Sequence, residues 1–467
     1  MRSSQTEGKR FLLSLLCLSF VGLVAAGCGL TDGSSSSSGG SAVSGSAFVI
    51  GTDAPVASVV SFQVVVESVD AIDANGNSTP LLSGAPTVDF ARYNGLQTLL
   101  DMNNVPVGTY TSISVTFGTA TIGYLQTQTG SAPVVQTENA VLTTSTVQTT
   151  LATPLVVSQS EPVGIRLDFD LRKSIQVDSN GQITGQVTPT LNIKAVSPSD
   201  PGAYIDEFDV AVVSVNAQGQ SFVVQGPHGH QFTIDVNGQT EWDNNESLSD
   251  LTTNSIVQIS GTIDRADSTI DADEVAILSQ DGFYAGGQVT YVQPATGTAS
   301  SFDLYVRGLL PTTTGVSLGQ IAQVNLSGNE KFFIYWMHNP LTEYLFNSSA
   351  LVPGQHIAIG GPASGAANAQ AVTCKRVVLR HWGYNGTIVP GSINNNGSFQ
   401  MNVTGFAGQL VPGMVTVYTS PLTSFRDGLT GFGDIASSDS IRVVGLLLED
   451  PSSGQLVLLA HYVDLLQ

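Results

Sequence analysis

The sequence predicts an all-β protein, with an N-terminal antiparallel β-sandwich followed by three small β-barrels. Three observations support this fold class. Short alternations of apolar and polar residues recur along the chain, and turn dipeptides such as Asn-Gly separate them. Charged residues make up only 11% of the chain, while Gly, Ser, Thr and Val, which favour turns and strands, take their place. The second half of the chain also contains one sequence pattern three times.

Residues 1–27 have the pattern of a secretory signal peptide. Basic residues in the first ten positions precede the apolar run FLLSLLCLSFVGLV, which is too short for a comfortable spanning helix. The sequence AAGC at 25–28 resembles the lipobox of bacterial lipoproteins. This resemblance implies that a lipid on Cys28 holds the chain to a membrane. The alternative is an ordinary cleaved signal in which Cys28 is incidental.

Residues 28–46 are predicted to form a tether, because Gly, Ser, Thr and Ala dominate them. A flexible coil of this length reaches roughly 20–25 Å on average. Gly29 is not the Asp that retains lipoproteins at the inner membrane in Gram-negative sorting. By that analogy we expect anchoring in the cell envelope at the outer membrane.

Residues 47–197 are predicted to form the sandwich. SFQVVVESVDAI and TYTSISVTF read as strands, and Asp73–Ser78 reads as a hairpin turn. VGIRLDFDL and ITGQVTPTLNIKAV read as later strands joined through an Asn180-Gly181 turn. The segment from Gly95 to Asn103, GLQTLLDMN, is the one helical candidate and predicts a short helix or turn.

Three stretches carry a resemblance over residues 46–197: GTDAPVASVVSFQVVVESVDAI, VDFARYNGLQTLLDMNNVPVGTYTSISVTF and VGIRLDFDLRKSI. Together they resemble a family of bacterial lipoprotein domains of unknown function that sits just behind a lipobox. The resemblance implies a sandwich at the cell envelope, and it carries no catalytic residues.

The repeated pattern divides the rest into units at 204–281, 284–382 and 383–467. Each unit has a Ser-Phe pair that opens a strand, then an aromatic residue after Thr or Leu-Thr, then a glycine inside an apolar strand. The pairs begin at Ser221, Ser301 and Ser398, the aromatic residues are Trp242, Tyr344 and Phe425, and the glycines are Gly261, Gly360 and Gly445. The middle copy contains an insertion before Leu341. Units of about five strands with a glycine at a bend suit small closed barrels.

These units resemble an uncharacterised bacterial family of repeated OB-like β-barrel modules, over residues 204–467. Nucleic acid is nevertheless excluded as a partner by charge. The chain has a formal net charge of −21, and removing residues 1–27 leaves 13 basic and 36 acidic residues. Such a surface repels phosphate backbones.

Several motifs have a chemical and a structural interpretation. GVSLG at 315–319 matches the nucleophile motif of hydrolases but lacks the βα context that this chemistry needs. His228 and His230 are too few for a metal site. Asp73 and Asp178 begin short oxygen-rich loops that could hold calcium, but neither loop has EF-hand spacing, so hairpin turns explain them.

One further set keeps both interpretations. Asp168 and Asp170 alternate along a strand, either as a carboxylate pair or as ordinary acids of a solvent-facing side. Cys374 in AVTCKRVVL fits a buried apolar position.

Phe333, Tyr335 and Trp336 lie in the densest aromatic stretch, KFFIYWMHNPLTEYLF, near the insertion of the middle copy. They are either an exposed platform for a sugar or partner, or ordinary packing between barrels.

We therefore expect an envelope lipoprotein with a structural or binding role, no catalytic residues, no metal and no cofactor. Its expected partners are a membrane, through the lipid on Cys28, and a glycan or another envelope protein. Carbohydrate binding by the OB-like barrels is the first alternative. Hydrolysis of an envelope polymer is the second, and it requires paired acids in a cleft.

Overall fold

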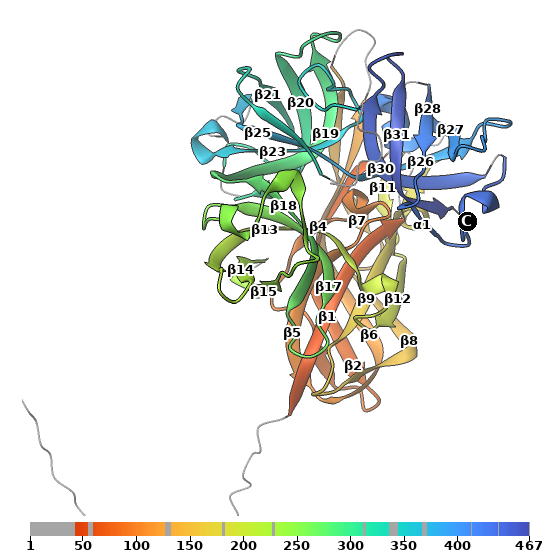
Figure 1. Cartoon of the computed structure of the whole chain (residues 1–467). Helices are drawn as coiled ribbons and strands as arrows, with labels where there is room; N and C mark the ends of the chain where they lie inside the picture. Colours follow the sequence, from red (N-terminus) through yellow and green to blue (C-terminus); the bar gives the residue numbers. More distant parts are fainter. Residues whose placement is uncertain are drawn as a thin grey trace, which may run out of the picture. The chain divides into compact units, whose positions relative to one another are not determined.

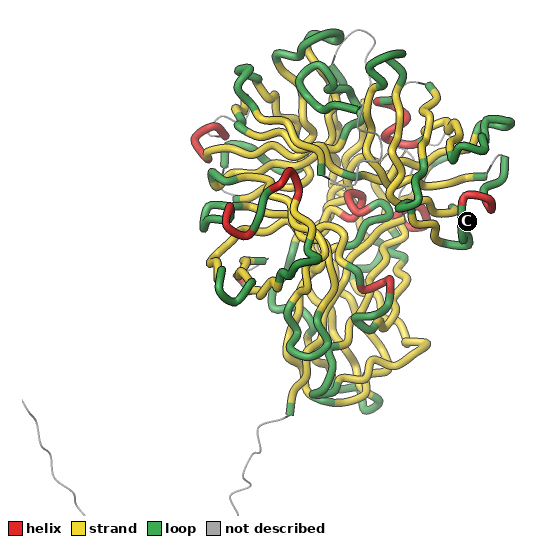
Figure 2. The backbone as a smooth tube through the Cα atoms, in the orientation of Figure 1, coloured by secondary structure: helices red, strands yellow, loops and turns green. Residues whose placement is uncertain are grey.

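The computed structural model describes residues 43–54, 59–126, 132–179, 183–226, 229–311, 314–335, 344–366, 371–411, 413–437 and 439–466. All of them belong to one compact unit. Strands dominate this unit and form five sheets (Figures 1 and 2). The expected all-β fold class is thus confirmed. In the described part of the chain, no helix is both long and apolar enough to cross a membrane.

The N-terminal sandwich consists of two sheets. One sheet has the order β12-β9-β1-β5, and the other has the order β10-β11-β7-β6-β2-β3, with β4 beside β2 and β8 beside β6. The strands are β1 (Ser44–Ala54), β2 (Val59–Asp73), β3 (Ser78–Pro80), β4 (Thr87–Asp89), β5 (Thr98–Pro106), β6 (Gly108–Gln126), β7 (Val134–Leu142), β8 (Thr146–Val157), β9 (Val163–Asp170), β10 (Ile175–Val177), β11 (Ile183–Val187) and β12 (Leu191–Val196). The short helical turns are η1 (Phe90–Tyr93), α1 (Leu171–Ser174) and η2 (Pro201–Ala203).

Alternation of side chains explains why these segments form a sandwich. In β6, Ile113, Val115 and Phe117 are fully or almost fully buried, while the residues between them are more exposed. Most strand pairs are antiparallel as expected, but β1 pairs with β9 and β7 with β11 in parallel. Each sheet of the sandwich therefore contains one parallel strand pair among antiparallel ones.

The predicted hairpin turn at Asp73–Ser78 joins β2 to β3. Asp73 Oδ1 accepts hydrogen bonds from the backbone N–H groups of Asn75 and Asn77 at 2.8 and 2.9 Å. This closes the turn locally and commits the carboxylate that a calcium site would have used. The second predicted turn, Asn180-Gly181, lies outside the described residues.

Of the short helix or turn predicted at Gly95–Asn103, the helix is wrong, whereas Gly95 itself lies in a turn. This segment leaves η1, passes through Gly95 with a φ of +77°, and continues as β5. Its backbone groups bond to other parts of the protein: Gln97 receives hydrogen bonds from Asp206 and Glu207, and its own N–H donates to the Asp206 carboxylate. Partners distant in the sequence replace the internal bonds of a helix, and a single-segment pattern cannot reveal them.

Each of the three later sheets is built from one repeat. The first contains β13 (Ile205–Asn216), β14 (Ser221–Gln225), β15 (Gln231–Asp235), β16 (Glu241–Trp242), β17 (Ile256–Ile263) and β18 (Ile270–Ser279), with η4 (Asp243–Asn245) and η5 (Leu248–Asp250). The second contains β19 (Gly282–Gln293), β20 (Ser301–Leu310), β21 (Ile321–Asn325), β22 (Lys331–Ile334), β23 (His356–Pro362), β24 (Ala371–Thr373) and β25 (Arg376–Arg380), with η6 (Ala363–Ala366). The third contains β26 (Trp382–Ile388), β27 (Ser398–Val403), β28 (Met414–Tyr418), β29 (Ser424–Arg426), β30 (Ser440–Glu449) and β31 (Leu456–Leu465), with α2 (Gly405–Leu410) and η7 (Phe432–Asp434).

All three sheets share one strand order. In the first, the sequence β15-β14-β13-β17-β18 closes on itself because β15 also pairs with β18. The third closes in the same way through β28 and β31. In the second, β24 and β25 occupy the place of one closing strand that is interrupted at Cys374 and Lys375. Each repeat is therefore a small OB-like barrel.

The repeat motif marks the interior of each barrel. Phe222, Phe302 and Phe399 are at most 1% exposed and belong to the barrel cores. Tyr344 is also buried in the second barrel's core, as expected from its place in the repeat.

The glycine of the middle repeat is shifted by one residue from the expectation. Gly261 and Gly445 lie at bulges where a Cβ atom would come within 2.1 Å of a carbonyl oxygen in the next strand. The strand register aligns Gly361, not Gly360, with them. Gly360 is needed for another reason, since its Cβ would meet the Leu278 carbonyl oxygen of the first barrel at 2.1 Å.

Candidate functional site

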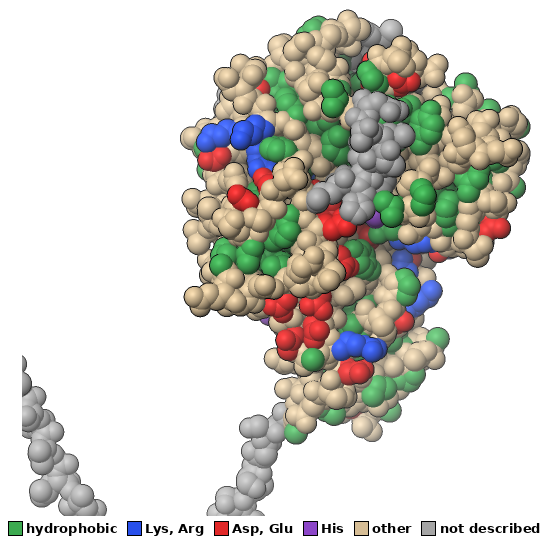
Figure 3. Space-filling view, viewed as in Figure 1, with side chains coloured by type: hydrophobic (Ala, Val, Ile, Leu, Met, Phe, Trp, Pro, Cys, Tyr) green, Lys and Arg blue, Asp and Glu red, His purple; other side chains and the backbone are tan. Residues whose placement is uncertain are grey.

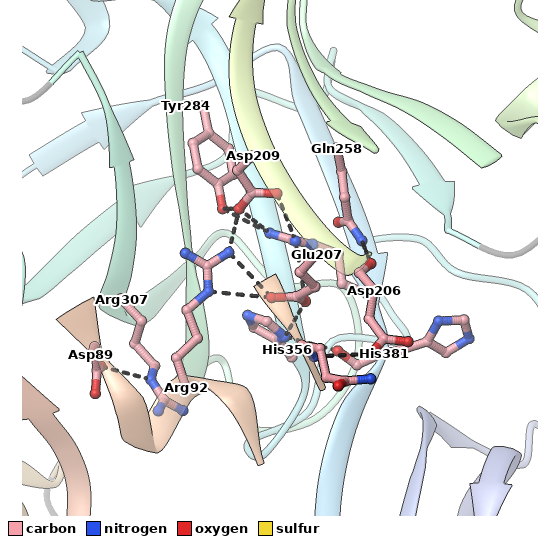
Figure 4. A network of polar contacts seen from close by, with 12 residues as sticks. Asp89, Arg92, Asp206, Glu207, Asp209, Gln258, Tyr284, Arg307, His356 and His381 are labelled. Atoms are coloured by element: carbon pink, nitrogen blue, oxygen red, sulfur yellow. Dashed lines mark hydrogen bonds and ion pairs between the residues drawn. The ribbon is translucent and has the colours of Figure 1, made fainter. Parts of the chain in front are cut away.

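A buried cluster of charged side chains lies where the sandwich meets the first two barrels (Figure 4). Arg92 projects from η1 of the sandwich and forms ion pairs with Glu207 and Asp209 of β13. Arg380 at the end of β25 contacts the same two acids, at 3.1 Å from Glu207 and 2.9 Å from Asp209. Two acids of one barrel are thus held between an arginine of the sandwich and an arginine of the second barrel.

Tyr284 of β19 completes this cluster. Its hydroxyl donates a hydrogen bond to Asp209 and accepts one from Arg380 at 2.7 Å. Burial alone would raise the pKa of Asp209, but Arg380 and Arg92 lower it well below its usual range. The carboxylate is therefore ionised and paired on several sides, which is the condition for a stable buried charge.

A second ion pair extends the contact between the sandwich and the second barrel. Arg307 of β20 lies 3.4 Å from Asp89, and Asp89 also accepts a hydrogen bond from the Phe62 backbone N–H at 2.9 Å. The Arg307 guanidinium lies 5.5 Å from the ring centroid of Trp382, the first residue of β26. The third barrel thereby contacts the same network.

Asp206 is the point where the sandwich, the first barrel and the third barrel meet. Its Oδ2 accepts a hydrogen bond from the Gln97 backbone N–H at 2.9 Å, and its Oδ1 accepts one from the Tyr462 hydroxyl at 3.1 Å. Burial raises the pKa of Asp206 to about 7, although Arg426 and the Tyr462 hydroxyl act in the opposite direction. This carboxyl changes its protonation near neutral pH.

Next to Asp206 lies a polar cavity of about 150 Å³. All three barrels and the segment before β5 line it, with the residues Leu96, Tyr204, Asp206, Glu207, Gln258, Ser260, Glu274, Tyr335, His381, Ser424, His461 and Tyr462. Ligand pockets usually measure roughly 300–1,000 Å³. The size of this cavity suits a few water molecules better than a sugar unit.

The titratable groups of this cavity have shifted pKa values. Burial raises the pKa of Glu274 to about 7 and lowers that of His461 to about 4. The rings of His381 and His461 stack with centroids 4.8 Å apart, and burial together with this neighbour lowers the pKa of His381 well below its usual value. Both imidazoles are therefore neutral at neutral pH. Over the residues that the structure describes, no group of three or more His, Cys, Asp or Glu is arranged to hold a metal ion.

The aromatic residues singled out from the sequence separate in the structure. Tyr335 is 2% exposed, and its hydroxyl hydrogen-bonds to Ser260 Oγ at 2.6 Å, so it lines the cavity rather than forming an exposed platform. Phe333 is half-buried beneath the Arg376 guanidinium, which lies 4.1 Å from its ring centroid. Trp336 and Cys28 lie outside the described residues, so ligand contact and lipidation there stay predictions.

The other motifs have structural roles where they are described. Ser317 of GVSLG is exposed in the loop between β20 and β21, with no helix after it. His230 pairs with Asp101 of the sandwich at 2.7 Å, while His228 lies outside the described residues. Cys374 is a free, buried cysteine of the second barrel's core, as expected, and burial raises its pKa to about 12.

Asp168 and Asp170 have different contacts. Asp170 Oδ1 accepts a hydrogen bond from the Lys173 backbone N–H at 3.0 Å and so caps α1. Asp168 lines a second cleft, which is larger than the cavity next to Asp206.

The sequence reasoning missed the central cluster. Glu207 and Asp209 look like ordinary polar positions of an alternating strand, and Arg92 lies in a loop. One signal was available: Arg376 and Arg380 flank the apolar run VVL in a chain with few basic residues. A charge in a buried strand requires a partner, although the sequence does not say which one.

Comparison with known families agrees with this architecture. Residues 45–184, within the sandwich, match the model of a domain of unknown function, DUF4382. Residues 211–276, within the first barrel, match that of a second domain of unknown function, DUF5666. No curated protein matches the chain. The second and third barrels repeat the strand order of the region similar to DUF5666.

Proposed function

We propose that this chain is an envelope lipoprotein with a structural or binding role and no catalytic activity. A lipid on Cys28 anchors it in the outer membrane, and the chain between Cys28 and β1 tethers the β-rich body. The predicted tether bound of 46 is too late, because Ser44–Ser46 already pair with β5. The lipobox-like sequence AAGC at 25–28 supports the anchor. The structural role is supported by the buried ion pairs of Arg92, Glu207, Asp209 and Arg380, which join the sandwich and two barrels. Such pairs fix orientation, which suits a rigid body that presents surfaces to partners.

Metabolic labelling tests the anchor. The full chain is expressed in a Gram-negative host that receives an alkyne-tagged fatty acid, and membranes are separated from soluble material. Label and membrane association are expected for the wild type and to be absent in Cys28→Ser. Cys17→Ser, which changes a cysteine within the leader, is the matched control and should remain labelled. Labelling of Cys28→Ser would contradict the proposal.

Carbohydrate binding is the first alternative for the binding role. Phe333 supports it, because this aromatic residue is only half-buried and comes three positions before the predicted contact Trp336 in the sequence. A glycan array probed with the wild type and with Trp336→Ala tests this reading. We expect a bound glycan that the variant loses; absence of any binding by the wild type would contradict it.

Hydrolysis of an envelope polymer is the second alternative, and one observation favours it. Asp206 and Glu274 line the same cavity, and burial raises the pKa of both to about 7, a value suited to acid–base chemistry. The cavity of about 150 Å³ is nevertheless small for a polymer unit. Release of new reducing ends from envelope polysaccharides by the wild type, and its loss in Glu274→Gln, would establish hydrolysis against our proposal.

A further inference from the structure

Nearly half of the basic residues of this acidic protein line one cleft. The chain after residue 27 contains 13 Lys and Arg residues. Six of them line a single cleft of about 450 Å³: Arg166, Arg172, Lys173, Lys194, Arg426 and Arg442. Figure 3 shows Lys and Arg side chains near β9 and β12, on the side of the last barrel. Because a random distribution would scatter these charges, their gathering in one cleft requires a reason.

Two structural units build this cleft. Arg166 projects from β9 and Lys194 from β12 of the sandwich, while Arg426 on β29 and Arg442 on β30 belong to the third barrel. Gly95 closes the cleft between them, and a Cβ there would meet Arg442 Nε at 2.5 Å. The cleft therefore exists only because the two units are docked.

The acids around the cleft leave an excess of positive charge. Asp53, Asp168 and Asp427 line it, and the fully buried Asp464 lies behind it and pairs with both Arg426 and Arg442 at 2.8 Å. Burial raises the pKa of both Asp53 and Asp168, and the charge of Asp168 raises the pKa of Asp53 further. Lys173 also pairs with Asp170 at 2.7 Å, so six cations face five nearby carboxylates, and two of these ionise less readily than usual.

Several donors in the cleft are not committed to these acids. Arg166 and Asp168 are 3.9 Å apart, as are Arg442 and Asp427, which is longer than a hydrogen bond. Arg166 Nε is buried and has no hydrogen-bond partner within the described residues. A guanidinium with free donors beside a second guanidinium matches the paired oxygens of an oxyanion.

We propose that this cleft binds the phosphate group of a small polar molecule. The volume of about 450 Å³ falls within the usual range for ligand sites and exceeds the needs of a bare anion. Two arginines from the third barrel and one from the sandwich surround the phosphate, and Lys194 at the exposed rim adds a point charge. A soluble sugar phosphate and a phospholipid headgroup share this chemistry. The proposal does not depend on lipidation of Cys28.

Calorimetric titration of the full chain in detergent tests this site. The probes are glycerol 3-phosphate, inorganic phosphate and glycerol, and vesicles with and without phosphatidylglycerol provide the lipid arm. We expect glycerol 3-phosphate to bind more tightly than inorganic phosphate, with no binding of glycerol. Preference for phosphatidylglycerol vesicles over the soluble phosphate assigns the lipid source, and the reverse order assigns the soluble source.

Two pairs of variants localise the binding. Arg166→Gln with Lys194→Gln should weaken glycerol 3-phosphate at least tenfold, whereas Lys331→Gln with Lys375→Gln removes the same charge elsewhere and should have no effect. Lys194→Gln alone, at an exposed position, keeps the test valid if the double variant does not fold, with an expected loss of about threefold. No binding of any phosphate probe at millimolar concentration, or equal weakening by both pairs, would overturn the proposal.

Discussion

Arg92 of the sandwich and Asp209 of the first barrel lie 117 positions apart in the sequence and form an ion pair in which both side chains are less than a tenth exposed. Arg380 of the second barrel binds the same acid from another side. Three structural units therefore share one buried carboxylate. Buried contacts of this kind hold the units in one arrangement, so unfolding one unit also breaks its contacts with the others.

Removal of Arg92 should destabilise the whole body. Arg92→Met leaves Glu207 and Asp209 buried with one cation fewer, and breaking a buried pair from one side costs about 3–5 kcal/mol. Urea unfolding followed by tryptophan fluorescence measures the loss. Lys375→Met breaks the exposed pair with Asp281 and should cost less than about 1 kcal/mol. Equal effects of the two variants would show that the central cluster does not hold the units together.

The Tyr335 hydroxyl should contribute to the contact between the first and second barrels. Tyr335→Phe removes its hydrogen bond with Ser260 and leaves a buried oxygen with one partner fewer, which costs about 1–2 kcal/mol. Tyr291→Phe, at a half-buried tyrosine of the second barrel, is the matched control and should change the unfolding free energy by less than half as much. If Tyr335 were an exposed platform residue, its substitution would also be neutral.

Asp206 should lower the free energy of unfolding as the pH rises from about 4 to 7, whereas the buried His381 and His461, with their lowered pKa values, contribute in the opposite direction. Asp206 has a folded pKa raised to about 7, so in this window the native state keeps a proton that the unfolded chain has released. One such group gives a slope of up to about −1.4 kcal/mol per pH unit. Asp206→Asn should remove this negative contribution, so the slope measured by urea unfolding at several pH values should become more positive by up to this amount. Glu161→Gln, at an exposed carboxyl, should leave the slope unchanged; a slope equally steep in Asp206→Asn would refute the raised pKa.

The two bulge glycines should tolerate no side chain. Gly261→Ala and Gly445→Ala place a Cβ within 2.1 Å of a backbone oxygen, so a strand must shift, at about 1–3 kcal/mol or more. Gly361→Ala should cost less, because its nearest atom is 3.3 Å away. Gly238→Ala has open space around the new methyl group and is the control. Thermal unfolding midpoints give the order, and an equal midpoint for all four variants would contradict the register described above.

Local patterns were sufficient to predict the fold class but not the contacts between units. Alternation in β6 and the repeated Ser-Phe pair predict strands and core phenylalanines, since both depend on neighbours in the sequence. The segment after Gly95 was expected to form a short helix or turn, but most of it forms β5, because its backbone partners in β1 and at Asp206 are distant in the sequence. The register shift from Gly360 to Gly361 was hidden for a related reason: two adjacent glycines serve two different contacts.

The charged cluster and the basic cleft illustrate the same limit. Arg92, Glu207 and Arg380 come from three separate segments, and none of these segments indicates the partner of its charged residue. Likewise, the basic residues of the cleft are scattered from 166 to 442 in the sequence. The residues of the charged cluster and of the basic cleft come together only when the sandwich docks on the barrels. No spacing rule within one segment could therefore have predicted them.

The central claim, that a lipid on Cys28 holds this rigid β-rich body in the envelope, is tested most directly by mass spectrometry of the mature N-terminus. The full chain is purified from the membranes of a Gram-negative host and digested, and the first peptide is identified. We predict a peptide that begins at Cys28 and carries a thioether-linked diacylglycerol. A mature chain that begins at another residue, or an unmodified Cys28, would contradict the proposed function.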